Sequence, residues 1–120
     1  MGAPDTVAYC HCRDCRRVTA APVAAFAAFR NRDLRLIPER DKAKTVTEGV
    51  SRWFCPDCGS QLMARFDYLP DQSYVPLGIL DQADQLPPEV HCHAASALPW
   101  LHIDDALARV EGTARATLRR

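Results

Sequence analysis

The sequence lacks an excess of charge of either sign and any long apolar run. Fifteen basic residues balance fifteen acidic ones among 120 residues, so net charge gives no indication of a nucleic-acid or anionic-membrane partner. No segment approaches the roughly 18 apolar residues that a membrane-spanning helix requires. With 48% apolar and 25% charged residues, the composition is typical of a globular protein and not of a disordered chain. The sequence therefore predicts one domain over residues 1–120 and neither a nucleic-acid nor a membrane partner.

The N-terminal residues also lack the basic region and apolar core of a secretory signal. Arg16 and Arg17 precede an alanine-rich segment that resembles a twin-arginine export signal, but a cluster of three cysteines stands before them and would be discarded with it. We therefore expect a cytoplasmic protein. Thiols stay reduced in that compartment, so clustered cysteines are interpreted as metal ligands or redox groups.

Short apolar segments separated by turn-forming residues predict a mainly β fold. Strands are expected at residues 34–37, 45–47, 50–54, 62–66 and 73–80. The segment 22–29 fits a buried strand and an alanine-rich helix about equally well. A short C-terminal helix is expected over residues 106–110, begun by Asp104 and Asp105 and ended by Gly112.

Three of the six cysteines, Cys10, Cys12 and Cys15, form a C-x-C-x-x-C pattern. Their thiolates can converge on one tetrahedral metal ion, whereas disulfides between such close neighbours are strained. Three protein ligands leave a fourth position open, which is typical of a catalytic zinc site. Arginines near the cluster would lower the thiol pKa values and attract an acidic small molecule, although each alone also fits a solvated surface position. These candidate substrate-binding residues are Arg13, Arg16 and Arg17.

A second cluster, Cys55-Pro56-Asp57-Cys58-Gly59, has the spacing of a zinc knuckle. Two sulfurs at this spacing can meet one metal ion, and glycine supplies the backbone freedom that the turn needs. A thioredoxin-like redox pair is the alternative, but such a pair usually opens a helix, and the flanking residues favour strands. A knuckle contributes only two ligands and needs partners from elsewhere.

The sixth cysteine lies in His91-Cys92-His93. Alternation along a strand would place His91 and His93 on one face and Cys92 on the other. His91 is the candidate catalytic residue, as a late metal ligand or an acid–base group. The alternative is a buried cysteine between surface or hydrogen-bonded histidines.

Together these motifs extend over most of the chain in a recognisable order. They are Cys10-His11-Cys12-Arg13-Asp14-Cys15-Arg16-Arg17, Arg52-Trp53-Phe54-Cys55-Pro56-Asp57-Cys58-Gly59-Ser60, Leu77-Gly78-Ile79-Leu80-Asp81, Pro87-Pro88-Glu89-Val90-His91 and Ser96-Ala97-Leu98-Pro99-Trp100. This order resembles the glutathione-dependent formaldehyde-activating enzyme / centromere protein V domain family. The resemblance covers residues 3–111 and implies a zinc-bearing, mainly antiparallel β-tent domain. The basic C-terminal residues from Gly112 on separately predict a flexible tail over residues 112–120.

The resemblance also implies a carbon–sulfur lyase that acts on glutathione-type adducts such as S-hydroxymethylglutathione. By this analogy Cys10, Cys12 and Cys15 hold a catalytic zinc, and Cys55 and Cys58 provide half of a structural zinc site. Members of the family carry another C-x-C-G motif, which has no counterpart among the residues before Tyr9. Either this second zinc is absent, or its missing ligands come from Cys92, a histidine or a second chain, the last of which predicts a homodimer.

A non-catalytic zinc module that binds a protein partner or a small thiol is the alternative function. A site with three thiolates donates much charge to its metal, which makes the metal a weak Lewis acid unless surrounding hydrogen bonds temper it. Closure of the first cluster by a fourth protein ligand would favour this alternative over a lyase.

Overall fold

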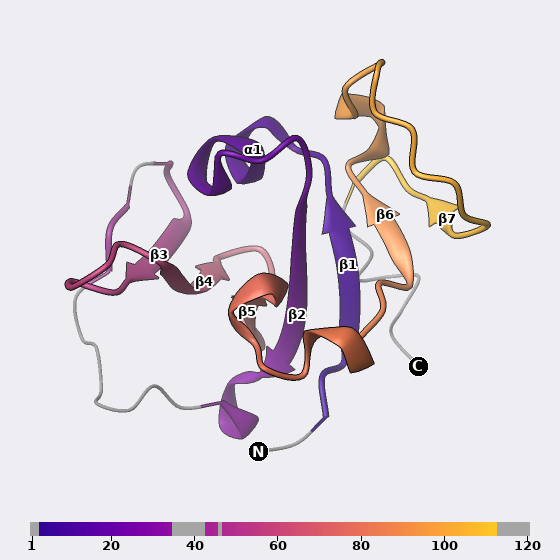
Figure 1. The fold of residues 1–120 in the computed structure, drawn as a ribbon. Coiled ribbons are helices and arrows are strands. Elements are labelled where there is room, and N and C mark those ends of the chain that lie inside the picture. The colour runs from indigo at the N-terminus through magenta and orange to yellow at the C-terminus, as the bar shows by residue number, and fades with distance from the viewer. Residues whose placement is uncertain (1–2, 35–42, 46, 113–120) are drawn as a thin grey trace.

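The computed structural model describes residues 3–34, 43–45 and 47–112. All its strands lie in one seven-stranded sheet of order β3-β4-β5-β2-β1-β6-β7 (Figure 1). The strands are β1 (Thr6–Cys10), β2 (Ala24–Arg30), β3 (Val50–Phe54), β4 (Gln61–Phe66), β5 (Gln72–Pro76), β6 (Val90–Cys92) and β7 (Ala108–Arg109). One α-helix, α1 (Arg13–Thr19), lies beyond the end of β1, and four short 3₁₀ turns are η1 (Asn31–Asp33), η2 (Leu77–Ile79), η3 (Ala83–Gln85) and η4 (Ala94–Ser96). The predicted mainly β fold is confirmed.

The sheet is antiparallel over most of its width and parallel at one side. The pairs β1–β2, β2–β5, β3–β4 and β4–β5 run antiparallel. β6 pairs parallel with β1, and β7 pairs parallel with β6. β6 follows a crossover that leaves β5 and contains η2 and η3, and parallel pairing requires such a long connection.

The ambiguous segment 22–29 forms β2, the strand between β1 and β5. Ala27 and Ala28 are fully buried although they point to opposite faces of the sheet. A strand covered on both faces shows a continuous apolar run instead of an alternating one. This double burial explains why the sequence pattern of β2 does not distinguish it from a helix.

The C-terminal helix expected over residues 106–110 is not formed, and β7 occupies part of this segment. Asp105, expected to cap the helix, instead accepts a hydrogen bond from the Leu107 N–H (3.0 Å) and contacts His91 Nε2 (2.9 Å). The Arg109 side chain donates to the Ile103 carbonyl (3.0 Å). These side-chain bonds hold the backbone in a turn, in direct competition with helical hydrogen bonds.

Other expected elements differ in extent. The strand expected over residues 73–80 ends at Pro76, whose ring supplies no N–H to continue the ladder, and η2 follows. Leu34 lies outside the strands, and the rest of the segment 34–37 lies outside the described residues. Near the expected strand 45–47, Lys44 forms an isolated bridge with Arg52, and residue 46 is not described. Residues 113–120 of the expected tail also lie outside the described part.

Apolar side chains cover both faces of the sheet. On one face Val7, Ala27, Phe29 and Val75 form a buried cluster, against which Leu34, Leu77, Leu80 and Leu86 pack. On the other face the buried Cys15, Ala24 and Phe26 contact Cys10, Cys12 and Tyr74. The first cysteine cluster is thus part of a packed face. No helix in the described part of the chain is long and apolar enough to span a membrane.

Candidate metal centre

The structure brings Cys10, Cys12 and Cys15 together where β1 ends and α1 begins. Their three Sγ atoms lie within 4.8 Å of one another, and Cys10 Sγ is 3.5 Å from Cys12 Sγ. Two sulfurs bound to one tetrahedral zinc at about 2.3 Å lie roughly 3.8 Å apart. The three thiols therefore fit a zinc ion with little movement. Within the described ranges, no other group of three or more His, Cys, Asp or Glu side chains converges in this way.

α1, which the sequence analysis did not predict, gives the cluster its geometry. Cys12 is the N-cap residue, and its Sγ accepts a hydrogen bond from the Cys15 N–H at 3.3 Å. Asp14 lies in the first turn, Arg16 in the last, and Ala20 ends the helix in the left-handed conformation. Acidic residues early and basic residues late complement the helix dipole. That charge order within the cysteine motif was the signal by which the helix could have been predicted.

The three thiols have different acidities. Hydrogen bonds from Cys10 and Cys15 lower the pKa of Cys12. The pKa of Cys10 is raised by its hydrogen bonds with Cys12 and Cys15 and by burial. A hydrogen bond with Cys10 lowers the pKa of Cys15, but its hydrogen bond with Cys12 and its burial outweigh this and raise the pKa to about 12. The cluster thus holds its first negative charge at the helix N-terminus, and full deprotonation calls for a cation.

A buried arginine that the sequence analysis missed stands behind the cluster. The side chain of Arg52 is 5% exposed, and its Nη2 donates to Asp14 Oδ2 at 2.8 Å. Its Nη1 donates to Gln61 Oε1 at 2.8 Å. Its charge also acts to lower the pKa of Cys15. Arg52 therefore joins the β3–β4 hairpin to α1 and places a fixed positive charge near the thiols.

The arginines that sequence proximity favoured do not line the cleft beside the cluster. Arg16 donates from Nε to the His11 carbonyl (3.1 Å) and from Nη2 to the Ser96 carbonyl (3.4 Å). Arg13 and Arg17 are exposed on α1. The structure thus places none of these three predicted substrate-binding residues on the cleft wall.

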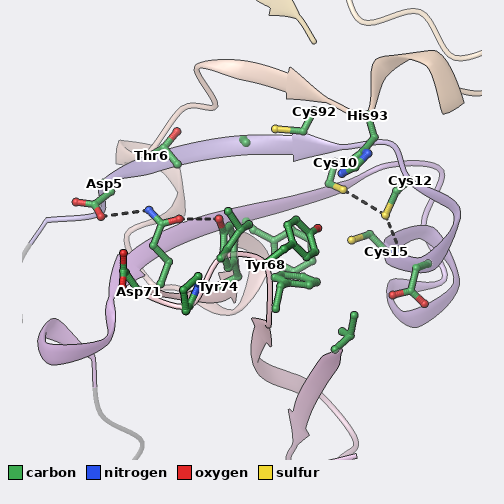
Figure 2. A pocket seen from close by; sticks show the side chains of 18 of the residues that line it. Asp5, Thr6, Cys10, Cys12, Cys15, Tyr68, Asp71, Tyr74, Cys92 and His93 are labelled. Atoms are coloured by element: carbon green, nitrogen blue, oxygen red, sulfur yellow. Dashed lines mark hydrogen bonds between the residues drawn. The ribbon is translucent and has the colours of Figure 1, made fainter. Parts of the chain in front are cut away.

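A cleft of about 870 Å³ opens beside the thiols on their face of the sheet (Figure 2). Phe26, Phe66, Tyr68 and Tyr74 supply its aromatic walls. The pKa of Tyr68 is raised to about 12 by desolvation and by the negative charge of the nearby thiolates. Its phenol consequently stays protonated near neutral pH and can donate a hydrogen bond inside the cleft.

The histidines of the third cysteine motif point to different sides of the sheet. His93 has φ 51°, a left-handed conformation that ends β6 and begins η4. This turn breaks the expected alternation: Cys92 and His93 both line the cleft, whereas His91 does not. Figure 2 shows His93 beside Cys10 and Cys12. His93, which the sequence analysis did not select, is the histidine next to the thiols.

His91 is buried, with 1% of its surface exposed, in a chain of hydrogen bonds. Its Nδ1 lies 2.8 Å from His11 Nε2, its Nε2 lies 2.9 Å from Asp105 Oδ2, and Tyr9 stacks on its ring. Burial, followed by the charges of His91 and Arg109, lowers the pKa of His11. The hydrogen bond from His91 is the largest factor that lowers the pKa of Asp105 to about 2. The hydrogen-bond chain thus anchors the loop of the cysteine cluster from behind, through His11, the residue between Cys10 and Cys12.

Cys55 and Cys58 lie apart from the first cluster, in the turn between β3 and β4. The hydrogen bond with Ser60 lowers the pKa of Cys58, which is exposed. In the part of the chain that the structure describes, no third ligand joins these two cysteines. Cys92 lies opposite Cys10 in the β1–β6 strand pair, whereas β3, which leads into the Cys55–Cys58 turn, is the edge strand on the other side of the sheet. Cys92 is therefore not brought next to Cys55 and Cys58.

Comparison with known protein families gives a match to a family model, and comparison with curated proteins gives no match. The matching family model is described as "Glutathione-dependent formaldehyde-activating enzyme" and covers residues 1–96. The matched segment contains both cysteine clusters and the His91-Cys92-His93 motif. The chain therefore belongs to the glutathione-dependent formaldehyde-activating enzyme family.

Proposed function

We propose that this protein is a zinc-dependent carbon–sulfur lyase that acts on glutathione-type thiol adducts resembling S-hydroxymethylglutathione. The observation that carries the proposal is the set of three convergent thiols at the wall of a cleft of about 870 Å³. That volume is within the range of about 300–1,000 Å³ usual for small-molecule sites. Reduced thiols of this kind fit a cytoplasmic protein, which is the compartment we propose.

Cys10, Cys12 and Cys15 would hold the zinc. When bound, zinc supplies a Lewis acid that stabilises a substrate thiolate and polarises a substrate oxygen. The cleft brings substrate to the thiol cluster, and its aromatic walls offer apolar surface beside the reacting atoms. Arg52 offsets part of the negative charge that three thiolates accumulate.

Cleavage of a hydroxymethyl thioether requires a proton to move. The carbon–sulfur bond breaks with its electron pair left on sulfur, while the hydroxyl oxygen loses a proton and becomes the carbonyl oxygen of the aldehyde. The sulfur can take up that proton to give the free thiol, so atoms and charge balance. We assign the transient holding of the proton to His93, which lines the cleft beside the thiols, and hydrogen-bond donation to the substrate oxygen to Tyr68.

This assignment gives His91, the candidate catalytic residue of the sequence analysis, a different task. His91 does not line the cleft, and both its ring nitrogens have partners, in His11 and Asp105. Because a residue so engaged acts only through its neighbours, we propose that it positions the metal-binding loop.

The decisive experiment follows formaldehyde labelled with carbon-13 by NMR in the presence of glutathione and zinc-loaded protein. We expect exchange between free formaldehyde and its glutathione adduct to accelerate over the protein-free solution. Cys12→Ser is expected to return the rate to that of the solution, and His93→Gln to lower the rate while zinc stays bound. Exchange no faster with the wild-type protein than without it would reject the lyase.

A non-catalytic zinc module that binds a thiol or a protein partner is the second candidate. It is favoured by the three-thiolate donor set, which weakens the Lewis acidity of a metal. The same NMR experiment separates the two functions. Saturable binding of glutathione without accelerated exchange would support the binding module.

We also propose that Cys55 and Cys58 form half of a structural zinc site, completed by ligands from another chain. The turn presents both cysteines at the end of the β3–β4 hairpin, with Cys58 exposed. Native mass spectrometry tests this, because completion by a second copy predicts a homodimer with more than one zinc per chain. Cys58→Ser should then lose the extra zinc and yield monomers. A monomer with one zinc in the wild-type protein would contradict the proposal.

A further inference from the structure

The cleft has two chemically different ends. The thiols of Cys10, Cys12 and Cys15 lie at one end, and Asp5 lies at the other (Figure 2). Arg30 and Gln72 also line the cleft and contact Asp5. A ligand whose sulfur reaches the thiol end can therefore extend toward a charged end.

Asp5 is held in place by several neighbours. Arg30 Nε donates to its Oδ1 at 3.3 Å, and Gln72 Nε2 donates to its Oδ2 at 3.2 Å. The Tyr74 hydroxyl in turn donates to Gln72 Oε1 at 2.8 Å. The backbone N–H of Asp5 bonds to the Ala28 carbonyl at 2.7 Å. The carboxylate is thus an ordered acceptor at the cleft wall.

The charged end carries both signs. Arg30 and Arg32 contribute guanidinium groups, and Asp5 and Asp71 contribute carboxylates. A purely anionic ligand end would be repelled by the carboxylates, and a purely cationic end by the arginines. A zwitterion satisfies both, with its ammonium group at Asp5 and its carboxylate at the guanidinium of Arg30, whose side chain is 55% exposed.

The length of the cleft agrees with one class of zwitterionic thiol. At about 3.3 Å per residue, β1 and the residue before it separate Asp5 from Cys10 by roughly 16 Å. Eight covalent bonds join the sulfur to the α-nitrogen of a γ-glutamyl-cysteinyl compound, which spans roughly 10 Å when extended. A metal–sulfur bond at one end and a hydrogen bond at the other bring the reach to about 15 Å. In cysteine or cysteinylglycine only three covalent bonds join the sulfur to the ammonium nitrogen, so these thiols cannot place the ammonium at Asp5 while the sulfur lies at the thiol cluster.

We propose that Asp5, Gln72 and Arg30 form a subsite for the α-amino acid end of γ-glutamyl thiols. This inference rests on the proposed function, since it requires the sulfur of the ligand to lie at the thiol cluster. The subsite makes the cleft selective for glutathione over shorter thiols, independently of any reaction.

The test measures thiol binding to protein loaded with cobalt in place of zinc, through the visible absorption of the metal. Glutathione is compared with three other probes. Cysteinylglycine lacks the γ-glutamyl group, N-acetylglutathione lacks the ammonium charge, and S-methylglutathione lacks the free thiol. Each probe is titrated into wild-type protein and into Asp5→Asn. Asp84→Asn, the same change at an exposed position outside the cleft, is the matched control.

We expect wild-type protein to bind glutathione at least about 10-fold more tightly than cysteinylglycine or N-acetylglutathione, as a charge-assisted hydrogen bond would give. Asp5→Asn should reduce this preference to within about 3-fold and leave the affinity for cysteinylglycine unchanged. Asp84→Asn should behave as wild type. Equal affinities in wild-type protein, or an equal loss for all probes in Asp5→Asn, would overturn the subsite.

Failure of the proposed function gives a different result. If no thiol alters the cobalt spectrum, the metal does not take a thiol ligand, and both proposals fall. If cysteinylglycine binds through its sulfur as tightly as glutathione does, the thiol-binding metal stands and the subsite alone is rejected. S-methylglutathione, which keeps both charged groups, should compete with glutathione only if the charged end contributes to binding.

Discussion

At the scale of single residues, neighbours in space determine which polar groups can act. His91 and His93 are two positions apart, yet one is buried between His11 and Asp105 and the other lines the cleft. The left-handed backbone of His93 causes this difference. Residue type alone therefore does not assign a role to a histidine in this chain.

His91→Phe should weaken both the fold and the metal site. The ring of phenylalanine can keep the stacking with Tyr9, but His11 and Asp105 each lose a hydrogen-bond partner. His11 is buried, and an unsatisfied buried group costs about 1–3 kcal/mol, whereas water can replace the partner of the exposed Asp105. We therefore expect a decrease of that size in the free energy of unfolding, measured by urea denaturation. Competition with a chromophoric chelator should also show weaker zinc binding, because the loop loses its anchor.

His102→Phe is the matched control, since His102 is exposed. A surface substitution of this kind usually changes the free energy of unfolding by no more than about 0.5 kcal/mol. Unchanged zinc affinity in His91→Phe would contradict a positioning role, even if that variant were less stable.

The pH dependence of stability should report the Asp105–His91 contact. The folded protein lowers the pKa of Asp105 from 3.8 to about 2, so this carboxylate stabilises the fold above pH 4, and its contribution is lost as the pH falls from about 4 toward 2. We expect Asp105→Asn to be less stable than wild type at pH 6, with the difference in unfolding free energy shrinking below pH 4. Protonation of the thiols affects both proteins alike. A difference that stays constant down to pH 3 would show that the carboxylate charge is not involved.

At the scale of secondary-structure elements, side-chain bonds between elements build the site. α1 has only seven residues, which is too short to be stable alone. It is held by the packing of Cys15 against β2 and by the ion pair between Asp14 and Arg52. The β3–β4 hairpin thus stabilises the helix that contains Cys15 and begins at the N-cap residue Cys12.

Arg52→Met should test this coupling between elements. Removing one partner of a fully buried ion pair costs about 3–5 kcal/mol. We expect a smaller loss of about 2 kcal/mol, because Asp14 is 36% exposed and solvent screens its charge. Urea denaturation of Arg52→Met, Asp14→Asn and the double variant gives the coupling directly. If the loss of unfolding free energy in the double variant equals the sum of the losses in the two single variants, Arg52 and Asp14 do not act as a unit.

At the scale of the whole molecule, the sheet brings the site together from distant segments. The thiols come from the end of β1 and from α1, His93 follows β6, and Arg52 lies in β3. β6 pairs parallel with β1, which places Cys92 opposite Cys10. Metal bound to the thiols should therefore stabilise the sheet as well as the loop.

Removal of zinc should lower the thermal stability of the entire domain. A ligand that binds only the folded state at 1,000 times its dissociation constant stabilises it by about 4.1 kcal/mol. For a domain of this size each kcal/mol corresponds to about 4 °C, so we expect chelation to lower the Tm by roughly 15 °C. Calorimetry before and after chelation, with zinc added back, is the measurement. The double variant Cys10→Ser/Cys58→Ser, which lacks a ligand of each proposed zinc site, should show a low Tm that chelation does not change. A Tm unaffected by chelation in the wild-type protein would contradict a structural contribution of the metal.

The sequence by itself determined those features that depend on local spacing. Cys10, Cys12 and Cys15 can meet one ion because few residues separate them, and the short apolar segments specify strands such as β3 and β4. Only the tertiary structure decided which charges and histidines line the cleft or stand behind the thiols. Arg30, Arg52 and His93 were not predicted, because their positions depend on contacts with residues far away in the sequence. The C-terminal helix was predicted wrongly for the same reason: the contact of Asp105 with His91, across 14 residues, holds the segment in a turn, and pairing with β6 makes it a strand.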